Sequence, residues 1–333
     1  MAESPRCDIN DIPLPNTRRL SNLDGYLNGP VRDLIAEPTV PIPPEVAERH
    51  RIYALLLMAI ARWYWNPNKR GRLGVYPLNP SLAAGDIGNY LDKDYLGHNI
   101  GGLAVDADGR IIDFDFNHNE IFDSSAEHAE ARLVRRVFSL VQVEDTWNVN
   151  AARIPLRRGS LMPDVTIYTT LESCSQCSGV MALAAVKQVV YLQRDPGMFH
   201  IGNILWRLTE KTDLQAPLPI SGDRIGLPFF RMLNDRYDAF ADQQKSGKGS
   251  PFFCPPHSHE EYSPSVTSFL CTNSAYSVFK DGESAFDALS KQPLKYAGYK
   301  PSPTNLTNAK CLEEAVRFRC YATSKGRRGT PHK

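Results

Sequence analysis

The stretch that decides the fold is TLESCSQCSGVM at residues 170–181, read together with HAE at 128–130. Cys174 and Cys177 have the C-x-x-C spacing, which lets two thiolates approach one metal ion from a turn between a strand and a helix. His128 can supply a third, nitrogen ligand from another element. Three protein ligands leave one tetrahedral position for a water molecule, and zinc lowers the pKa of such a water toward neutrality.

A carboxylate stands beside these predicted ligands. Glu130 follows His128 by two residues, and we expect it to carry protons and not to bind the metal. Taken alone, a C-x-x-C is often two buried thiols, and a His-x-Glu is often helix surface. In this order they form the pattern H-x-E then C-x-x-C of zinc nucleobase deaminases, with Ser173 where that pattern has proline. Because proline stiffens a turn, its absence here affects the rigidity of the turn and not the binding of the metal.

The composition is that of an ordinary globular protein. The chain has 333 residues, of which 42% are hydrophobic and 23% charged, and its net charge is +1. This charge balance gives no global sign of a nucleic-acid partner, so any basic surface must be local. The polar start MAESPRCDIN and the lack of a long apolar run predict neither a secretion signal nor a membrane span. We expect a reducing, cytoplasmic location, and the oligomeric state stays open.

The chain is expected to fall into four segments. Residues 1–44 are rich in proline and predict an extended arm lying on the body. Residues 45–215 predict a zinc deaminase domain whose core motifs lie within 101–210. Residues 216–324 predict a partly helical C-terminal extension packed on that domain, and residues 325–333 a basic tail.

Hydrophobic periodicity predicts strands alternating with helices. In order, we expect a core helix over 45–65, a loop-rich segment over 66–100, a hairpin over 103–116, a helix capped by Ser124 or Ser125, a strand over 164–170, a helix over 177–185, a strand over 189–192, a helix over 202–209, a strand over 266–271, and helices over 275–289 and 306–319. On the helix after His128, we expect Arg132, Arg135 and Arg136 mostly on the solvent face. The pattern predicts a three-layer α/β domain.

Residues 101–210 resemble the cytidine deaminase superfamily, above all its tRNA adenosine deaminase branch, and a group of predicted bacterial nucleic-acid deaminases. The motifs that carry this resemblance are VDADGRIIDFDFN, HAE, TLESCSQCSGVM and VVYLQRDP, in the family's order. The resemblance implies a three-layer α/β/α fold with a central mixed sheet and added N- and C-terminal extensions. It also implies Zn²⁺ held by His128, Cys174 and Cys177, proton transfer by Glu130, and contact between Asn117 and the target base.

The implied reaction is hydrolytic deamination of cytosine to uracil or of adenine to hypoxanthine. A base within a polymer must be extruded, so Phe199 and His200 are expected to line the base pocket; alternatively, Phe199 caps the core. Arg153, Arg157 and Arg158 are candidates for contact with backbone phosphates; alternatively, they belong to a solvated loop.

Other functions stay open. The enzyme could act on a base in DNA or RNA, single-stranded or flipped out, or on a free base, nucleoside or nucleotide. A third possibility is a non-catalytic, zinc-bearing subunit that binds nucleic acid. Glu130 argues against the third, because a structural zinc site needs no acid. Cys254, His257 and His259 are metal-ligand types, but no second cluster follows at a finger-like spacing.

Overall fold

The computed structural model describes residues 29–65, 97–119, 122, 124–138, 161–210, 215–246 and 265–325, and the backbone of 68–71 and 74–77. In chain order, its elements are α2 (Val31–Ile35), α3 (Pro44–Trp63), β1 (Asn68–Gly71), β2 (Gly74–Pro77), β3 (Gly101–Val105), β4 (Ile111–Phe116), α4 (Ala129–Val137), β5 (Thr166–Thr169), α6 (Ser175–Leu183), β6 (Gln188–Tyr191), η4 (Pro196–Met198), α7 (Ile201–Leu208), β7 (Leu218–Ser221), α8 (Pro228–Lys245), α9 (Val266–Phe269), α10 (Asn273–Leu289) and α11 (Asn308–Lys325).

A mixed sheet of five strands in the order β4-β3-β5-β6-β7 forms the centre of the fold. Strand β3 pairs antiparallel with both β4 and β5, and the predicted hairpin is therefore confirmed. Gly109, with φ of 87°, takes the left-handed conformation in the turn that joins β3 to β4. Strands β5, β6 and β7 are parallel, so their carboxyl ends meet at one edge of the sheet. Ligands commonly bind beyond that edge in open α/β sheets.

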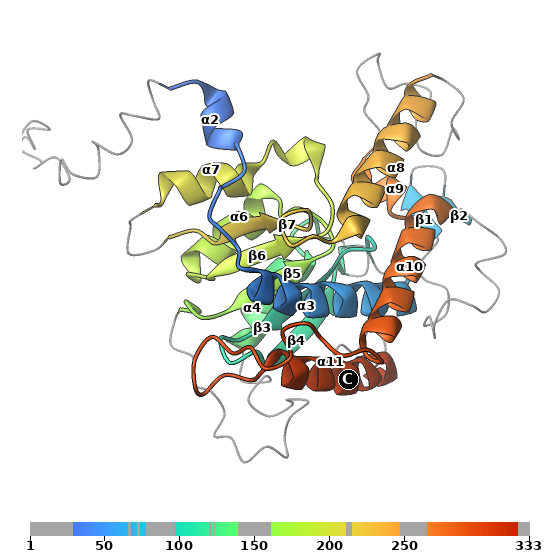
Figure 1. Ribbon diagram of the computed structural model, residues 1–333. Coiled ribbons are helices and arrows are strands. Elements are labelled where there is room, and N and C mark those ends of the chain that lie inside the picture. Colours follow the sequence, from blue (N-terminus) through green and yellow to red (C-terminus); the bar gives the residue numbers. More distant parts are fainter. Residues whose placement is uncertain are drawn as a thin grey trace, which may run out of the picture.

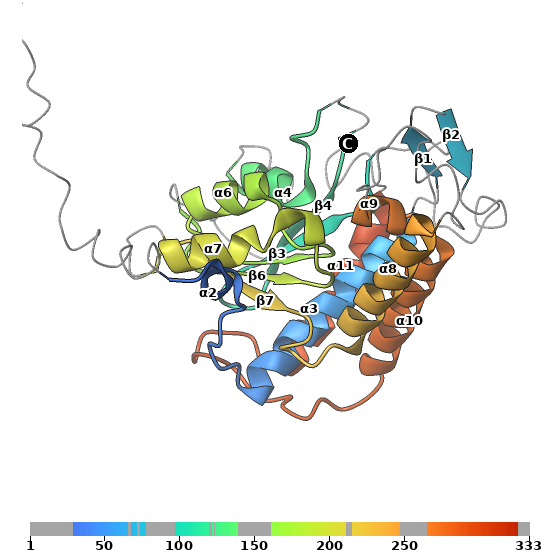
Figure 2. The ribbon, with the colours of Figure 1, turned by 90° about the horizontal axis from the view of Figure 1, so that it is seen from above.

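Helices cover both faces of this sheet (Figures 1 and 2). Helices α4, α6 and α7 pack on one face, where α4 lies against β3 and β4, and α7 against β7. Helices α3 and α11 pack on the other face, and α10 lies along α3. The expected three-layer α/β/α arrangement is confirmed.

Helix α3 forms the centre of the main hydrophobic core. It begins with Pro44 in its first turn and is apolar almost all round, because it packs against the sheet on one side and α10 and α11 on the other. Ile52, Leu56 and Ile60 are completely buried. The helix expected over 45–65 is confirmed at this position.

The C-terminal part of the chain takes a larger share in the fold than expected. Strand β7 completes the sheet, although it lies within the residues expected to form an extension of the domain. Pro219 has no N–H to donate within a ladder, and β7 can hold it because it is an edge strand. Helices α8 and α10 pack together next to α3.

One expected element was wrong. Residues 266–269 form the short helix α9 instead of a strand, because the Ser265 hydroxyl accepts a hydrogen bond from the Ser268 N–H and caps a helical turn. Within the segment expected to be loop-rich, β1 and β2 pair as a two-stranded antiparallel sheet. Cys254, His257 and His259, residues 1–28 of the arm and residues 326–333 of the tail lie outside the described part.

Candidate metal centre and catalytic site

Two helix N-termini bring the predicted ligands together. Cys174 is the N-cap residue of α6, after β5, and Cys177 lies in the first turn of that helix. His128 is itself the N-cap residue of α4, in an extended conformation with φ of −82° and ψ of 151°. The expectation that Ser124 or Ser125 caps this helix is therefore wrong. The Ser124 hydroxyl instead accepts from the Ala126 N–H, so the serine shapes the loop before the helix.

The three ligand atoms converge on one point. His128 Nδ1 lies 3.3 Å from Cys174 Sγ and 3.6 Å from Cys177 Sγ. The three atoms all lie within 4.8 Å of one another, and no other group of His, Cys, Asp and Glu with this geometry was found in the described part of the chain. One imidazole and two thiols form a donor set that suits zinc.

The charges in this cluster fit a cation. Hydrogen bonds from Cys177 and His128 lower the pKa of the Cys174 thiol, which favours the thiolate form that binds a metal ion. The hydrogen bond to Cys174 in turn raises the pKa of His128. The pKa of Cys177 is raised by its hydrogen bond with Cys174 and by burial. A metal ion bound by both sulfurs would remove the remaining proton.

Glu130 lies beside the ligands in the first turn of α4. It is only 3% exposed, and burial raises the pKa of its carboxyl group. Oε1 accepts hydrogen bonds from Ser173 Oγ at 3.0 Å and Thr169 Oγ1 at 3.3 Å. Oε2 lies 3.5 Å from Cys177 Sγ. A carboxyl group with a raised pKa next to a metal centre is suited to holding and releasing a proton.

Asn117 follows β4 and faces the start of α4. Its side chain is completely buried, and Oδ1 accepts a hydrogen bond from the Ala129 N–H at 2.8 Å. Because the backbone donor fixes which amide atom is the oxygen, Nδ2 points elsewhere. Nδ2 has no hydrogen-bond partner among the described residues. Asn117 can therefore offer a donor to a ligand, while its acceptor already holds α4 against the sheet.

The Glu172 carboxylate connects the loop before Cys174 to the loop at residues 195–200. Glu172 Oε1 pairs with His200 Nδ1 at 3.0 Å, and Glu172 Oε2 accepts from the Asp195 N–H at 3.1 Å. Burial raises the pKa of Asp195 to about 6. Glu172 and Asp195 lie in two different sequence motifs, so the sequence alone did not indicate that they are in contact.

Phe199 and His200 both have left-handed backbone conformations, with φ of 50° and 53°. This conformation is strained for residues other than glycine, and the Glu172–His200 pair helps to hold it. Phe199 is 76% exposed, so the alternative that it caps the core is wrong. His200 borders a cleft of about 330 Å³ beyond the carboxyl ends of β6 and β7, together with Tyr191 and Arg194.

Arg132 and Arg136 of α4 are not on the solvent face, so the expectation for them was wrong. Arg132 Nε and Arg136 Nη1 each donate to Asp115 Oδ2 at 3.0 Å, and Arg136 Nη2 lies 2.8 Å from Asp113 Oδ2. Both guanidinium groups are largely buried between α4 and β4, whereas Arg135 is exposed and pairs with Glu127. Arg153, Arg157 and Arg158 lie outside the described residues.

The described geometry defines an α/β domain with a His-Cys-Cys metal centre at the carboxyl end of a sheet strand. Residues 86–193 match the family model of the cytidine and deoxycytidylate deaminase zinc-binding region. That span contains all three ligands, Glu130 and Asn117, so this part of the chain is similar to the zinc-binding region of that family. No curated protein sequence matches the chain.

Several solved structures are similar to part of the chain. One, from a study of A-to-I editing by tRNA:A34 deaminases, has 22% identity and a TM-score of 0.28, covering 40% of this chain and 83% of that one. Guanine deaminase from Nitrosomonas europaea has 15% identity and a TM-score of 0.28, covering 60% and 89%. A diaminohydroxyphosphoribosylaminopyrimidine deaminase/5-amino-6-(5-phosphoribosylamino)uracil reductase from Thermotoga maritima has 16% identity and a TM-score of 0.33, covering 59% and 42%. None of these similarities bears on the substrate of this chain.

Among the described helices, none combines the length and the apolar character needed to cross a membrane.

Proposed function

We propose that the protein is a zinc-dependent hydrolytic deaminase that acts on a nucleobase within DNA or RNA. The observation that carries this proposal is the buried Glu130 carboxyl group beside the convergent atoms of His128, Cys174 and Cys177. Zinc held by these ligands would supply a water molecule with a pKa near neutrality. Since the thiol ligands must stay reduced, the proposal includes a reducing, cytoplasmic location.

Glu130 is the proposed catalytic residue. It takes a proton from the attacking water as the oxygen adds to C4 of cytosine or C6 of adenine. The carboxyl group passes that proton to the adjacent ring nitrogen and then assists the amino group in leaving as ammonia. The net change replaces the exocyclic amine by a carbonyl oxygen and consumes one water.

Asn117 is the proposed contact to the base edge. Its Nδ2 group is a buried donor without a partner among the described residues, and a buried donor is costly unless it is satisfied. An acceptor on the base would satisfy it. Cytosine and adenine both carry acceptors on their edges, so this contact does not choose between them.

The position of Phe199 favours a polymeric substrate. An exposed aromatic side chain on a restrained loop offers a face on which a neighbouring base can stack. We propose that Phe199 has this role and that His200, through Glu172, holds the loop that presents it. Contact of Arg153, Arg157 and Arg158 with phosphates stays a prediction.

Sequencing after incubation tests the proposed reaction. Wild type and Glu130→Gln would be incubated with single-stranded DNA, duplex DNA, structured RNA and free nucleotides. We expect C-to-T or A-to-G changes in one polymer pool with the wild type, and a rate at least about 100-fold lower with the variant. Deamination of free nucleotides alone would contradict the polymer substrate. No deamination by a zinc-loaded wild type would favour a non-catalytic role.

A further inference from the structure

Ser173 is the residue at which this chain departs from the P-C-x-x-C pattern. Proline carries no hydrogen-bond donor in its side chain, whereas serine carries a hydroxyl. Here that hydroxyl does not simply replace a ring in a turn, because Ser173 Oγ donates to Glu130 Oε1 at 3.0 Å. The departure therefore brings a donor into direct contact with the proposed proton carrier.

We infer that Ser173 is a positioning residue that fixes the orientation of the Glu130 carboxyl group, so that Oε2 is the oxygen that exchanges protons. This inference rests on the proposed function of Glu130. Ser173 holds Oε1, while Oε2 faces the metal ligands at 3.5 Å from Cys177 Sγ. A metal-bound thiolate has no proton to donate, so metal binding would leave Oε2 available to a water molecule.

The other donor to Oε1 is weaker. Thr169 Oγ1 lies 3.3 Å from Glu130 Oε1, but it lies closer, at 3.0 Å, to the Leu171 carbonyl oxygen. Since one hydroxyl hydrogen cannot serve both acceptors fully, the Thr169 bond to Glu130 is the poorer one. Ser173 is therefore the stronger of the two hydroxyl donors that hold Oε1.

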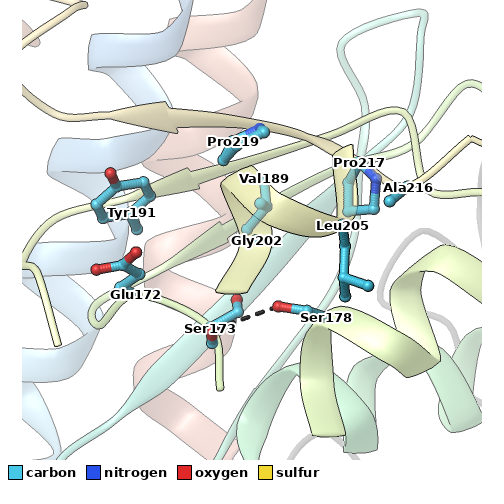
Figure 3. A pocket seen from close by; sticks show the side chains of 10 residues that line it. All are labelled: Glu172, Ser173, Ser178, Val189, Tyr191, Gly202, Leu205, Ala216, Pro217 and Pro219. Atoms are coloured by element: carbon cyan, nitrogen blue, oxygen red, sulfur yellow. Dashed lines mark hydrogen bonds between the residues drawn. The ribbon is translucent and has the colours of Figure 1, made fainter. Parts of the chain in front are cut away.

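Ser173 lies in closely packed surroundings. It is 4% exposed, and its carbonyl oxygen accepts from Ser178 Oγ at 3.3 Å (Figure 3). The cavity beside Ser173 and Ser178 is only about 10 Å³ and is lined mainly by apolar side chains such as Leu205 and Pro219 (Figure 3). A cavity of this size and polarity is poorly suited to a bridging water that could replace the hydroxyl.

Ser178 provides a matched control. It is buried, lines the same cavity and belongs to the same loop-and-helix unit, but its hydroxyl contacts Ser173 O and not Glu130. Ser178→Ala tests general packing around the loop, and Ser173→Ala tests the contact to Glu130. Ser173→Pro introduces the proline of the family pattern and removes the hydroxyl, whereas Ser173→Thr keeps the hydroxyl.

The first measurement does not depend on activity. High-resolution crystal structures of the zinc-loaded wild type and Ser173→Ala would show the Glu130 carboxyl group in one orientation in the wild type and rotated, or in two orientations, in the variant. Unchanged Glu130 coordinates in the variant would overturn the inference. This result can be obtained even if the wild type deaminates no substrate, which would refute the proposed function and not the restraint.

The second measurement is steady-state kinetics on the substrate found by sequencing, with zinc content as the control. We expect kcat to fall about tenfold in Ser173→Ala and in Ser173→Pro, with KM and zinc content unchanged, because the proton carrier loses its alignment. We expect Ser173→Thr to restore most of kcat and Ser178→Ala to stay within about twofold of the wild type. Equal losses in Ser173→Ala and Ser178→Ala, loss of zinc, or a wild-type kcat in Ser173→Pro would each overturn the inference.

Discussion

At the scale of single residues, the two polar atoms of the Asn117 side chain have different surroundings. Asn117 uses its oxygen to accept from the Ala129 N–H, while its Nδ2 donor has no partner among the described residues. The sequence resemblance predicted a contact between Asn117 and the base, but it could not show that only the donor is available. That detail depends on how the end of β4 packs against the start of α4, which a sequence motif does not specify.

Asn117→Asp separates these two uses of the side chain. Aspartate keeps an oxygen for the Ala129 N–H and replaces the Nδ2 donor by an acceptor. We expect the fold and zinc content to be retained and kcat/KM to fall about 10- to 100-fold, because an acceptor on the base then faces another acceptor. Steady-state kinetics with parallel zinc analysis would check this, and a kcat/KM within twofold of the wild type would refute a role in base recognition.

At the scale of elements, a buried charge cluster joins α4 to the edge strand β4. Arg132 and Arg136 pair with Asp113 and Asp115, and this fixes the helix that carries His128 and Glu130. From the sequence alone, we expected these arginines mostly on the solvent face of the helix. In the structure both faces of β4 are covered, the Phe face by α11 and the Asp face by α4.

The same aspartates also protect the edge of the sheet. Asp113 Oδ1 and Asp115 Oδ1 accept from the N–H groups of Phe114 and Phe116, at 2.8 Å each. Glu314 Oε1 accepts from the Ile111 N–H. Because side chains already bind these outward donors, β4 is a poor template for pairing with another strand.

Asp113 makes stability depend on pH. Burial, with Asp115 nearby, raises the pKa of Asp113 to about 7 despite Arg136. Between about pH 4 and pH 7, the folded state thus holds a proton that the unfolded state has lost, so this group makes the protein less stable as pH rises through that window. The slope is at most about 1.4 kcal/mol per pH unit.

Asp113→Asn should remove this contribution, since asparagine keeps an oxygen for the Phe114 N–H and does not titrate. Urea unfolding at intervals from pH 4.5 to 7.5 would compare the two proteins. We expect the free energy of unfolding of the wild type to fall with pH relative to that of the variant. Parallel curves would show that Asp113 is ionised throughout this range in the folded protein.

At the scale of the whole molecule, the sequence was most informative where chemistry and periodicity coincide. The core helix, the hairpin, β5, α6, β6 and α7 all lie near the predicted positions. Beyond residue 216 no motif guided the prediction, and Pro219 obscured a short strand that only its edge position permits. Packing of α10 and α11 on α3 depends on contacts between distant segments, so local sequence could not reveal how closely the C-terminal helices join the core.

The most direct test of the account is the zinc content of the purified protein. Metal analysis would compare the wild type, Glu130→Gln and the double variant Cys174→Ser/Cys177→Ser. We predict that Glu130→Gln retains all the zinc of the wild type, because Glu130 is not a ligand, and that the double variant binds one zinc fewer per chain. Equal zinc in the wild type and the double variant, or loss of zinc from Glu130→Gln, would contradict the metal centre described here.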